Sequence, residues 1–356
     1  MKLSTNRLPW LDWMRGIGAL MMLQGHVFHS FMRNDLRQEG PYQLSQFVGG
    51  MPPALFLFVL GITYSFLMDS QVRKGVPARG RVQAAAKRSG FLFLAAFAFR
   101  FQLWVVSIDK SPWTDLFRVD ILNVMGLSLL ILSPMAAFTT RERIRLCAVL
   151  GTVIALLTPP VSAIAWGGTP WFLKYYLIPD SLNFGIFPWA AFVAFGLSAG
   201  SLLRTLKPDE TGQAMQWFGW GGLALAFGAW VLSNMSLTIY PNSDFWSNSP
   251  ALIFIKLGVI LILMAFSWAW NLSLDPDKWS LVRQFGATSL LVYWVHVELV
   301  YGRSFWFFKE KLSVNPTVAM ALFVIVLMLG LSLLRTNWES VKTWRPGFGQ
   351  RPVSHS

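Results

Sequence analysis

Long apolar runs, separated by short polar loops, dominate the pattern of this 356-residue chain. The runs extend over roughly 17–25 residues, which is the length that an α-helix needs to cross the hydrocarbon core of a membrane. They do not alternate with a period of two, so the strands of a β-barrel are disfavoured. About ten such runs can be drawn, at 10–31, 50–68, 89–107, 120–138, 146–165, 185–203, 215–237, 251–270, 286–302 and 316–334.

Composition agrees with this pattern. The chain is 54% hydrophobic and 13% charged, whereas a soluble domain carries about 25% charged residues. The loops between the runs are short, so we expect residues 1–356 to form a single domain. The predicted fold is an all-α polytopic membrane protein, a bundle of about ten transmembrane helices.

Basic residues are concentrated in alternate loops. Lys and Arg gather at 73–88, at 141–145 and near both ends of the chain, while the intervening loops hold fewer of them. Cytoplasmic loops carry the excess of positive charge, so we expect both termini in the cytoplasm and a multi-pass protein of the inner membrane. This asymmetry also accounts for the net charge of +13, and no soluble basic domain is apparent that would bind nucleic acid.

Several classes of site are disfavoured. The single Cys147 provides no disulfide or cysteine-rich metal cluster. Zinc motifs, phosphate-binding glycine loops and nucleophile elbows are absent, so no metal is expected. The first apolar run is long and lacks a cleavage site after a short core, which predicts a retained first helix rather than a cleaved signal peptide.

The first run carries polar residues that a lipid-facing helix would not need. Asp12 and Arg15 share one face at its cytoplasmic end, where they form either a local ion pair or part of a site for a phosphate-bearing ligand. His26 lies 11 residues after Arg15, roughly 16 Å further along a helix, and His29 follows on a similar face. Two such imidazoles are either hydrogen-bonded packing residues or candidate general bases.

Other polar residues fall at a comparable depth, from the middle to the outer half of the membrane. They belong to four later runs: Arg100, Asp120, Asn123, Lys256, His296 and Glu298. One interpretation is a set of separate pairs, such as Arg100 with Asp120 and Lys256 with Glu298. The other is one polar cavity that opens to the outer face. The outer loops, such as 166–171, are rich in aromatic residues, which serve either as interface anchors or as a surface for sugars.

Five stretches together resemble a known family. The first runs from Leu11-Asp12 through Arg15-Gly16 to His26, and the others are residues 52–61, 119–127, 187–196 and 289–298. In this order they resemble the transmembrane acyltransferase superfamily, most of all the membrane domain of heparan-α-glucosaminide N-acetyltransferase-like proteins in a compact, bacterial-type form. The chain is also similar to acyltransferase family 3.

The resemblance implies transfer of an acyl group, expected to be acetyl, across the membrane. The donor would be acetyl-CoA or another acyl-CoA in the cytoplasm, and the acceptor a sugar hydroxyl or amine of a glycan or glycolipid outside. His26 would be the catalytic base, Arg15 would lie near the CoA entrance, and Asp120, Asn123, His296 and Glu298 would line the cavity. In the animal enzymes an Asn stands where His26 is and the reactive His follows, a role that only His29 could take here.

The chemistry allows several alternatives. Arg100 or Lys256 would stabilise the oxyanion that forms when the acceptor attacks the thioester, and transfer could be direct or pass through an acyl-histidine. A secondary transporter or exporter of a glycan or lipid-linked intermediate could use the same polar residues as a proton relay. A membrane-embedded partner subunit is a third possibility. The sequence leaves the acceptor, the acyl length and the oligomeric state open, a homodimer included.

Overall fold

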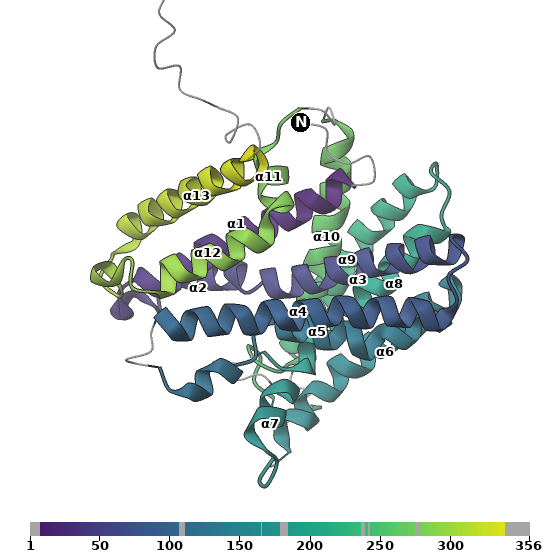
Figure 1. The fold of residues 1–356 in the computed structure, drawn as a ribbon, viewed down its shortest axis with the longest axis horizontal. Coiled ribbons are helices and arrows are strands. Elements are labelled where there is room, and N and C mark those ends of the chain that lie inside the picture. The colour runs from purple at the N-terminus through teal and green to yellow at the C-terminus, as the bar shows by residue number, and fades with distance from the viewer. Residues whose placement is uncertain are drawn as a thin grey trace, which may run out of the picture.

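The computed structural model describes residues 8–106, 111–164, 166–178, 184–235, 239–240, 243–274 and 278–338. These residues form helices and loops, with one isolated β-bridge between Met32 and Leu312 (Figure 1). The α-helices are α1 (Pro9–Phe31), α2 (Gly40–Gly49), α3 (Pro52–Arg73), α4 (Ala78–Val106), α5 (Ile121–Leu132), α6 (Thr140–Ala163), α7 (Trp171–Leu177), α8 (Ile186–Thr205), α9 (Thr211–Ser233), α10 (Pro250–Leu272), α11 (Leu281–Ala287), α12 (Ser289–Tyr301) and α13 (Val314–Thr336).

Local chemistry determines where several helices begin. Helices α1, α3 and α10 each have a proline in the first turn, where its missing N–H costs no hydrogen bond. Helix α6 begins with a capping box, in which the Glu142 amide donates to Thr139 Oγ1 and the Thr139 amide donates to the Glu142 carboxylate. These signals fix the helix ends at the loops that the hydropathy pattern predicts.

Each predicted run coincides with a helix. Seven helical segments are long and apolar enough to cross a membrane: 40–73, 78–106, 113–137, 140–163, 186–205, 250–272 and 314–336. Helices α1 and α9 are not among them. The run at 286–302 is divided at Thr288 into α11 and the 13-residue α12, which is too short. The count of about ten spans stays a prediction, and so does the cytoplasmic location of the termini, which lie outside the described residues.

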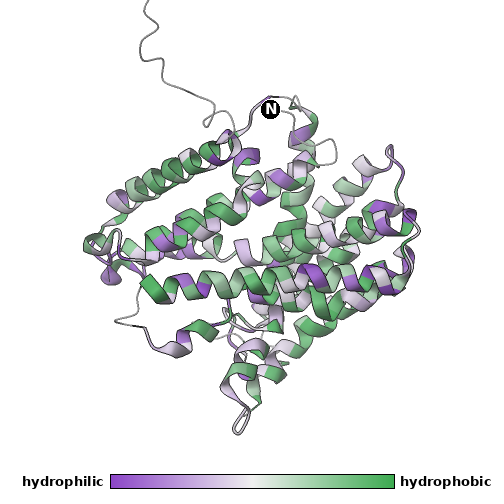
Figure 2. Ribbon diagram, in the orientation of Figure 1, coloured by the Kyte–Doolittle hydropathy of each residue, from purple (hydrophilic) through white to green (hydrophobic). Residues whose placement is uncertain are grey.

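Helix α1 packs against six other helices. It contacts α2, α3, α10, α11, α12 and α13, and Figure 1 shows it running beside α12 and α13. Its N-terminal half, with Trp10, Leu11 and Met14, joins one hydrophobic core with α3, α5, α8 and α10. Its C-terminal half, from Ala19 to Phe31, joins a second core with α11, α12 and α13. Figure 2 shows hydrophobic residues along most of α13, as expected for a helix against lipid.

Glycines bring certain helices into backbone contact. A Cβ atom on Gly286 of α11 would lie 1.7 Å from the carbonyl oxygen of Asp12, and one on Gly16 of α1 would lie 1.8 Å from that of Val282. Small residues allow this close approach, which is the usual means of packing helices in a membrane. The position of α11, and of α12 directly after it, is therefore fixed relative to α1.

One cation that the sequence assigns to a cytoplasmic loop is instead buried. Arg143 is fully buried in the first turn of α6, where its guanidinium forms an ion pair with Asp69 of α3. The Arg143 Nη1 group also donates to the Phe138 carbonyl at 3.0 Å. A buried charge of this kind needs such partners, so Arg143 holds α3 and α6 together rather than marking a loop.

Candidate functional site

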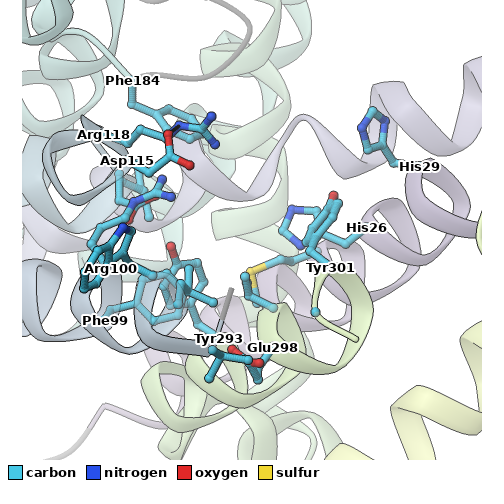
Figure 3. A pocket seen from close by; sticks show the side chains of 18 of the residues that line it. His26, His29, Phe99, Arg100, Asp115, Arg118, Phe184, Tyr293, Glu298 and Tyr301 are labelled. Carbon is cyan, nitrogen blue, oxygen red and sulfur yellow. Dashed lines mark hydrogen bonds and ion pairs between the residues drawn. The ribbon is translucent and has the colours of Figure 1, made fainter. Parts of the chain in front are cut away.

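A cavity of about 710 Å³ lies beside the C-terminal half of α1. Residues of α1, α3, α4 and α12 line it, together with the segment before α5 and the one after α12. Figure 3 shows Arg100, Asp115 and Arg118 on one side of the cavity and His26 and Tyr301 on the other. Five of the residues predicted from sequence line it: His26, His29, Arg100, Asp120 and Glu298.

The other five predicted residues lie outside the cavity lining: Asp12, Arg15, Asn123, Lys256 and His296. Arg15 forms an ion pair with Asp12 at 2.8 Å and donates to Thr63 Oγ1 at 2.9 Å, so it ties α1 to α3. The local ion pair predicted for Asp12 and Arg15 is therefore present, and whether Arg15 also serves a phosphate-bearing ligand stays a prediction.

Asn123 and Lys256 each contact an aromatic residue, Tyr176 and Trp189 respectively. The Asn123 amide donates to the Tyr176 hydroxyl at 3.1 Å, and its Oδ1 accepts from the Asp120 amide at 2.9 Å, so it connects α5 to α7. The Lys256 ammonium lies 5.3 Å from the centre of the Trp189 ring, a cation–π contact. Among the described residues Lys256 forms no ion pair with Glu298, so that proposed pair is absent.

His26 and His296 are joined by a hydrogen bond between α1 and α12. His26 Nδ1 lies 2.8 Å from His296 Nε2, and the ring planes differ by 18°. His296 is fully buried, and its Nδ1 lies 2.7 Å from the carbonyl oxygen of Val292 one turn earlier. The edge of the Tyr301 ring approaches His26, with 5.3 Å between ring centres. His296 therefore lies behind His26, and His26 faces the cavity.

His29 has a different environment. It is exposed, and its Nδ1 lies 3.2 Å from the hydroxyl of Tyr42 on α2. Its ring centre lies 6.1 Å from that of Tyr301, which also contacts His26, and Figure 3 shows it further along α1 than His26. The two imidazoles of α1 are thus at the same end of the helix, but only His26 is bonded to another histidine.

The opposite wall carries charge. Arg100 of α4 forms an ion pair with Asp120, which precedes α5, as the sequence suggested. Four buried polar atoms of the cavity lining have no hydrogen-bond partner among the described residues: Arg100 Nε, Trp104 Nε1, Asp120 Oδ2 and Glu298 Oε2. Buried polar atoms are nearly always satisfied by protein groups, ordered water or a ligand, so these four atoms are available to water or to a polar ligand in the cavity.

Several lining residues had not been selected from sequence. Asp115 and Arg118 form an ion pair at 3.1 Å before α5, and Tyr301 closes α12. Lys309 donates to the Tyr301 carbonyl at 2.5 Å, and burial lowers the pKa of its ammonium. The only sequence signal for Asp115, Arg118 and Lys309 was their place in loops that follow predicted outer helix ends, whereas Tyr301 lies at the end of the predicted run 286–302. Trp104, in contrast, continues the helix that carries Arg100, one turn further on.

Comparison with known proteins connects this site to a family. Residues 7–245 match the family described as "Heparan-alpha-glucosaminide N-acetyltransferase, catalytic". No curated protein matches the chain. The matched region includes His26, Arg100 and Asp120, whereas α12 with His296 and Glu298 lies beyond it. Because the match extends over more than half of the sequence, the chain belongs to the family of heparan-alpha-glucosaminide N-acetyltransferase catalytic domains.

Proposed function

We propose that this protein transfers an acetyl group from acetyl-CoA to a hydroxyl or amine of a glycan or glycolipid at the membrane, with His26 as the general base. The family supports an acetyl group and a sugar acceptor. The single observation that carries the assignment of the base is the position of His26. It lines the cavity, and one of its ring nitrogens is held by His296.

His26 is a better candidate for the base than His29. A general base must lie within hydrogen-bond reach of the proton that it removes and must keep a fixed orientation. His26 lies between His296 and Tyr301 on the cavity wall, whereas His29 is exposed and bonded to Tyr42. The position of His26 on α1 is further secured by Ser30, whose hydroxyl donates to the Val300 carbonyl at 2.8 Å.

The reaction that we propose is direct transfer. His26 accepts the proton of the acceptor O–H or N–H, and the freed electron pair attacks the thioester carbonyl. The C–S bond then breaks, and the CoA thiolate takes the proton back from His26. Arg100 is the cation proposed to stabilise the oxyanion, because it lines the cavity and Lys256 does not.

The polar lining supports a sugar acceptor. Arg100 Nε and Trp104 Nε1 are unsatisfied donors, while Asp120 Oδ2 and Glu298 Oε2 are unsatisfied acceptors. A hydroxyl group both donates and accepts, so a molecule with several hydroxyl groups satisfies all four atoms. An aromatic ring on the same lining, that of Tyr301, is 39% exposed and provides a face for a sugar ring.

The donor is proposed to enter from the cytoplasmic end of α1. CoA carries phosphate groups, and the basic residues of that side, such as Arg15 and Arg88, favour it electrostatically. Arg15 is already bonded to Asp12 and Thr63, so its contribution would be to hold the entrance in shape as well as to attract the anion.

The test is acetyl transfer by the purified full-length protein from radiolabelled acetyl-CoA to cell-envelope glycans. We expect His26→Ala to lower kcat by about 10²–10⁴-fold, the usual contribution of a general base. His29→Ala is the matched control and should stay within a few-fold of wild type. Release of the label by mild alkali would distinguish an ester from an amide.

Two outcomes would contradict the proposal. Full activity of His26→Ala would remove His26 as the base. Glycan flux in proteoliposomes without any dependence on acetyl-CoA would favour the transporter instead. Binding of acetyl-CoA to both variants shows whether each retains its fold.

A further inference from the structure

We infer that His296 is a positioning residue that fixes the tautomer of His26, so that the unprotonated Nε2 atom of His26 faces the cavity. The effect on acetyl transfer rests on the proposed function, whereas the tautomer itself does not. Two hydrogen bonds carry the inference: one between the imidazoles, and one from His296 to the backbone.

The first step is the proton on His296. Its Nδ1 lies 2.7 Å from the Val292 carbonyl oxygen. A carbonyl oxygen can only accept, so Nδ1 must carry the hydrogen. His296 is fully buried, and no carboxylate is bonded to it among the described residues. An unpaired buried imidazolium is costly, so the ring is neutral and its Nε2 has a lone pair.

The second step follows at His26. Because His296 Nε2 accepts, His26 Nδ1 must donate across the 2.8 Å that separates these atoms. The ring centres lie 5.0 Å apart and the planes differ by 18°, so the imidazoles meet edge to edge and the bond is nearly in line. A neutral His26 that carries its hydrogen on Nδ1 has its lone pair on Nε2.

The third step is the exposure of that lone pair. His26 lines the cavity, and its Nε2 has no hydrogen bond to any described residue. Nε2 is therefore the atom that is free to accept a proton from a bound acceptor. When it does so, the Nδ1–H bond to His296 becomes a charge-assisted bond, which stabilises the imidazolium. His296 itself gains and loses no proton.

Contacts before and after His296 in the sequence hold α12 against α1, and so hold the two imidazoles together. Helix α12 follows α11, whose Gly286 touches the backbone of α1, and Ser30 of α1 bonds to Val300 of α12. His296 lies beyond residues 7–245, so the positioning group comes from outside the region that matches the family. The role is comparable to that of the carboxylate in a hydrolase triad, which also orients an imidazole and selects its tautomer.

The tautomer can be measured directly. The chain has four histidines, so ¹⁵N-labelled histidine in protein held in nanodiscs gives a small set of ring nitrogen signals. His26→Asn assigns the signals of His26. We expect wild-type His26 to be protonated on Nδ1 and unprotonated on Nε2, and His296→Ala to convert it to a mixture of tautomers.

Activity gives an independent readout. We expect His296→Ala to lower kcat by about 10–100-fold, as loss of such orienting partners does, with an unchanged KM for acetyl-CoA. His296→Gln keeps a carbonyl oxygen that can accept from His26 Nδ1, and it should recover part of kcat and of the wild-type tautomer. A purely structural role would not be rescued in this way.

The opposite results are equally clear. A wild-type His26 protonated on Nε2 would overturn the inference, and so would an unaltered kcat in His296→Ala. If the wild-type protein transfers no acetyl group, the proposed function fails, yet the nitrogen spectra still test the tautomer. If His296→Ala does not fold, the wild-type spectrum and His296→Gln decide the question.

Discussion

Arg100 and Asp120 form an ion pair in the cavity that is more buried than the pair of Asp115 and Arg118. The two residues of the pair have separable roles. Their side chains are 15% and 9% exposed, so neither charge is well solvated. Losing one partner would leave the other charge buried and uncompensated. The proposed catalytic role belongs to Arg100, while Asp120 holds its guanidinium in place.

A pair of variants separates these roles. We expect Arg100→Met to lower stability by about 3–5 kcal/mol, because the Asp120 carboxylate is then unpaired, and to lower kcat by about 10²–10³-fold. Adding Asp120→Asn should restore the melting temperature but not kcat. Thermal unfolding in detergent and acetyl transfer are the two measurements. Recovery of kcat in the double variant would mean that Arg100 only balances the charge of Asp120.

Of the partners of these polar residues, the sequence predicted the pairing of Arg100 with Asp120 but not that of the histidines. The sequence predicted one level in the membrane for His26, Arg100, Asp120, Lys256, His296 and Glu298, because distance along a helix follows from residue number; Lys256 and His296 lie outside the cavity lining. It did not pair His26 with His296, which are separated by 270 positions. The choice between His26 and His29 also depends on contacts with α2 and α12, and these exist only after folding.

At the scale of elements, the contact between α1 and α11 sets the distance between the two imidazoles. The backbones touch at Gly16 and Gly286, and His296 lies on the helix that continues from α11 after Thr288. A change in the separation of α1 and α11 is therefore transmitted to the hydrogen bond between His26 and His296.

Gly286→Ala tests this coupling. The added Cβ would lie 1.7 Å from the Asp12 oxygen, so the helices must separate, at a cost of about 1–3 kcal/mol. We expect a lower melting temperature and a lower kcat. The control is Gly330→Ala on α13, where nothing lies within 4 Å of the added atom. If Gly330→Ala lowered the melting temperature and kcat as much as Gly286→Ala, the contact between α1 and α11 would not be what sets them.

The helices themselves were predictable because apolar length is a local property of the sequence. Every predicted run became a helix, and α6 and α10 begin where Thr139 and Ser249 cap them. Helices α2 and α7 and the break at Thr288 were missed for physical reasons. Helices α2 and α7 have ten and seven residues, too few for a membrane-spanning apolar run to mark them. The break at Thr288 lies within a predominantly hydrophobic run.

For the whole molecule, the orientation in the membrane remains a prediction from charge. Single cysteines in a Cys147→Ser background test it, since Cys147 is buried and free. Lys311→Cys lies in an exposed segment predicted to be outside, and Arg79→Cys lies in an exposed segment predicted to be inside. An impermeant maleimide added to intact cells should label the first and spare the second. The reverse pattern would invert the topology and place the cavity on the cytoplasmic side.

The order of the helices along the chain also determines when the histidine pair can form. His26 belongs to the first helix and His296 to one of the last, with 270 positions between them. During synthesis on the ribosome, α1 therefore enters the membrane long before the helix that completes its hydrogen bonding. A chain released early, before α12, carries an imidazole without its partner, so only a fully translated protein possesses the histidine pair.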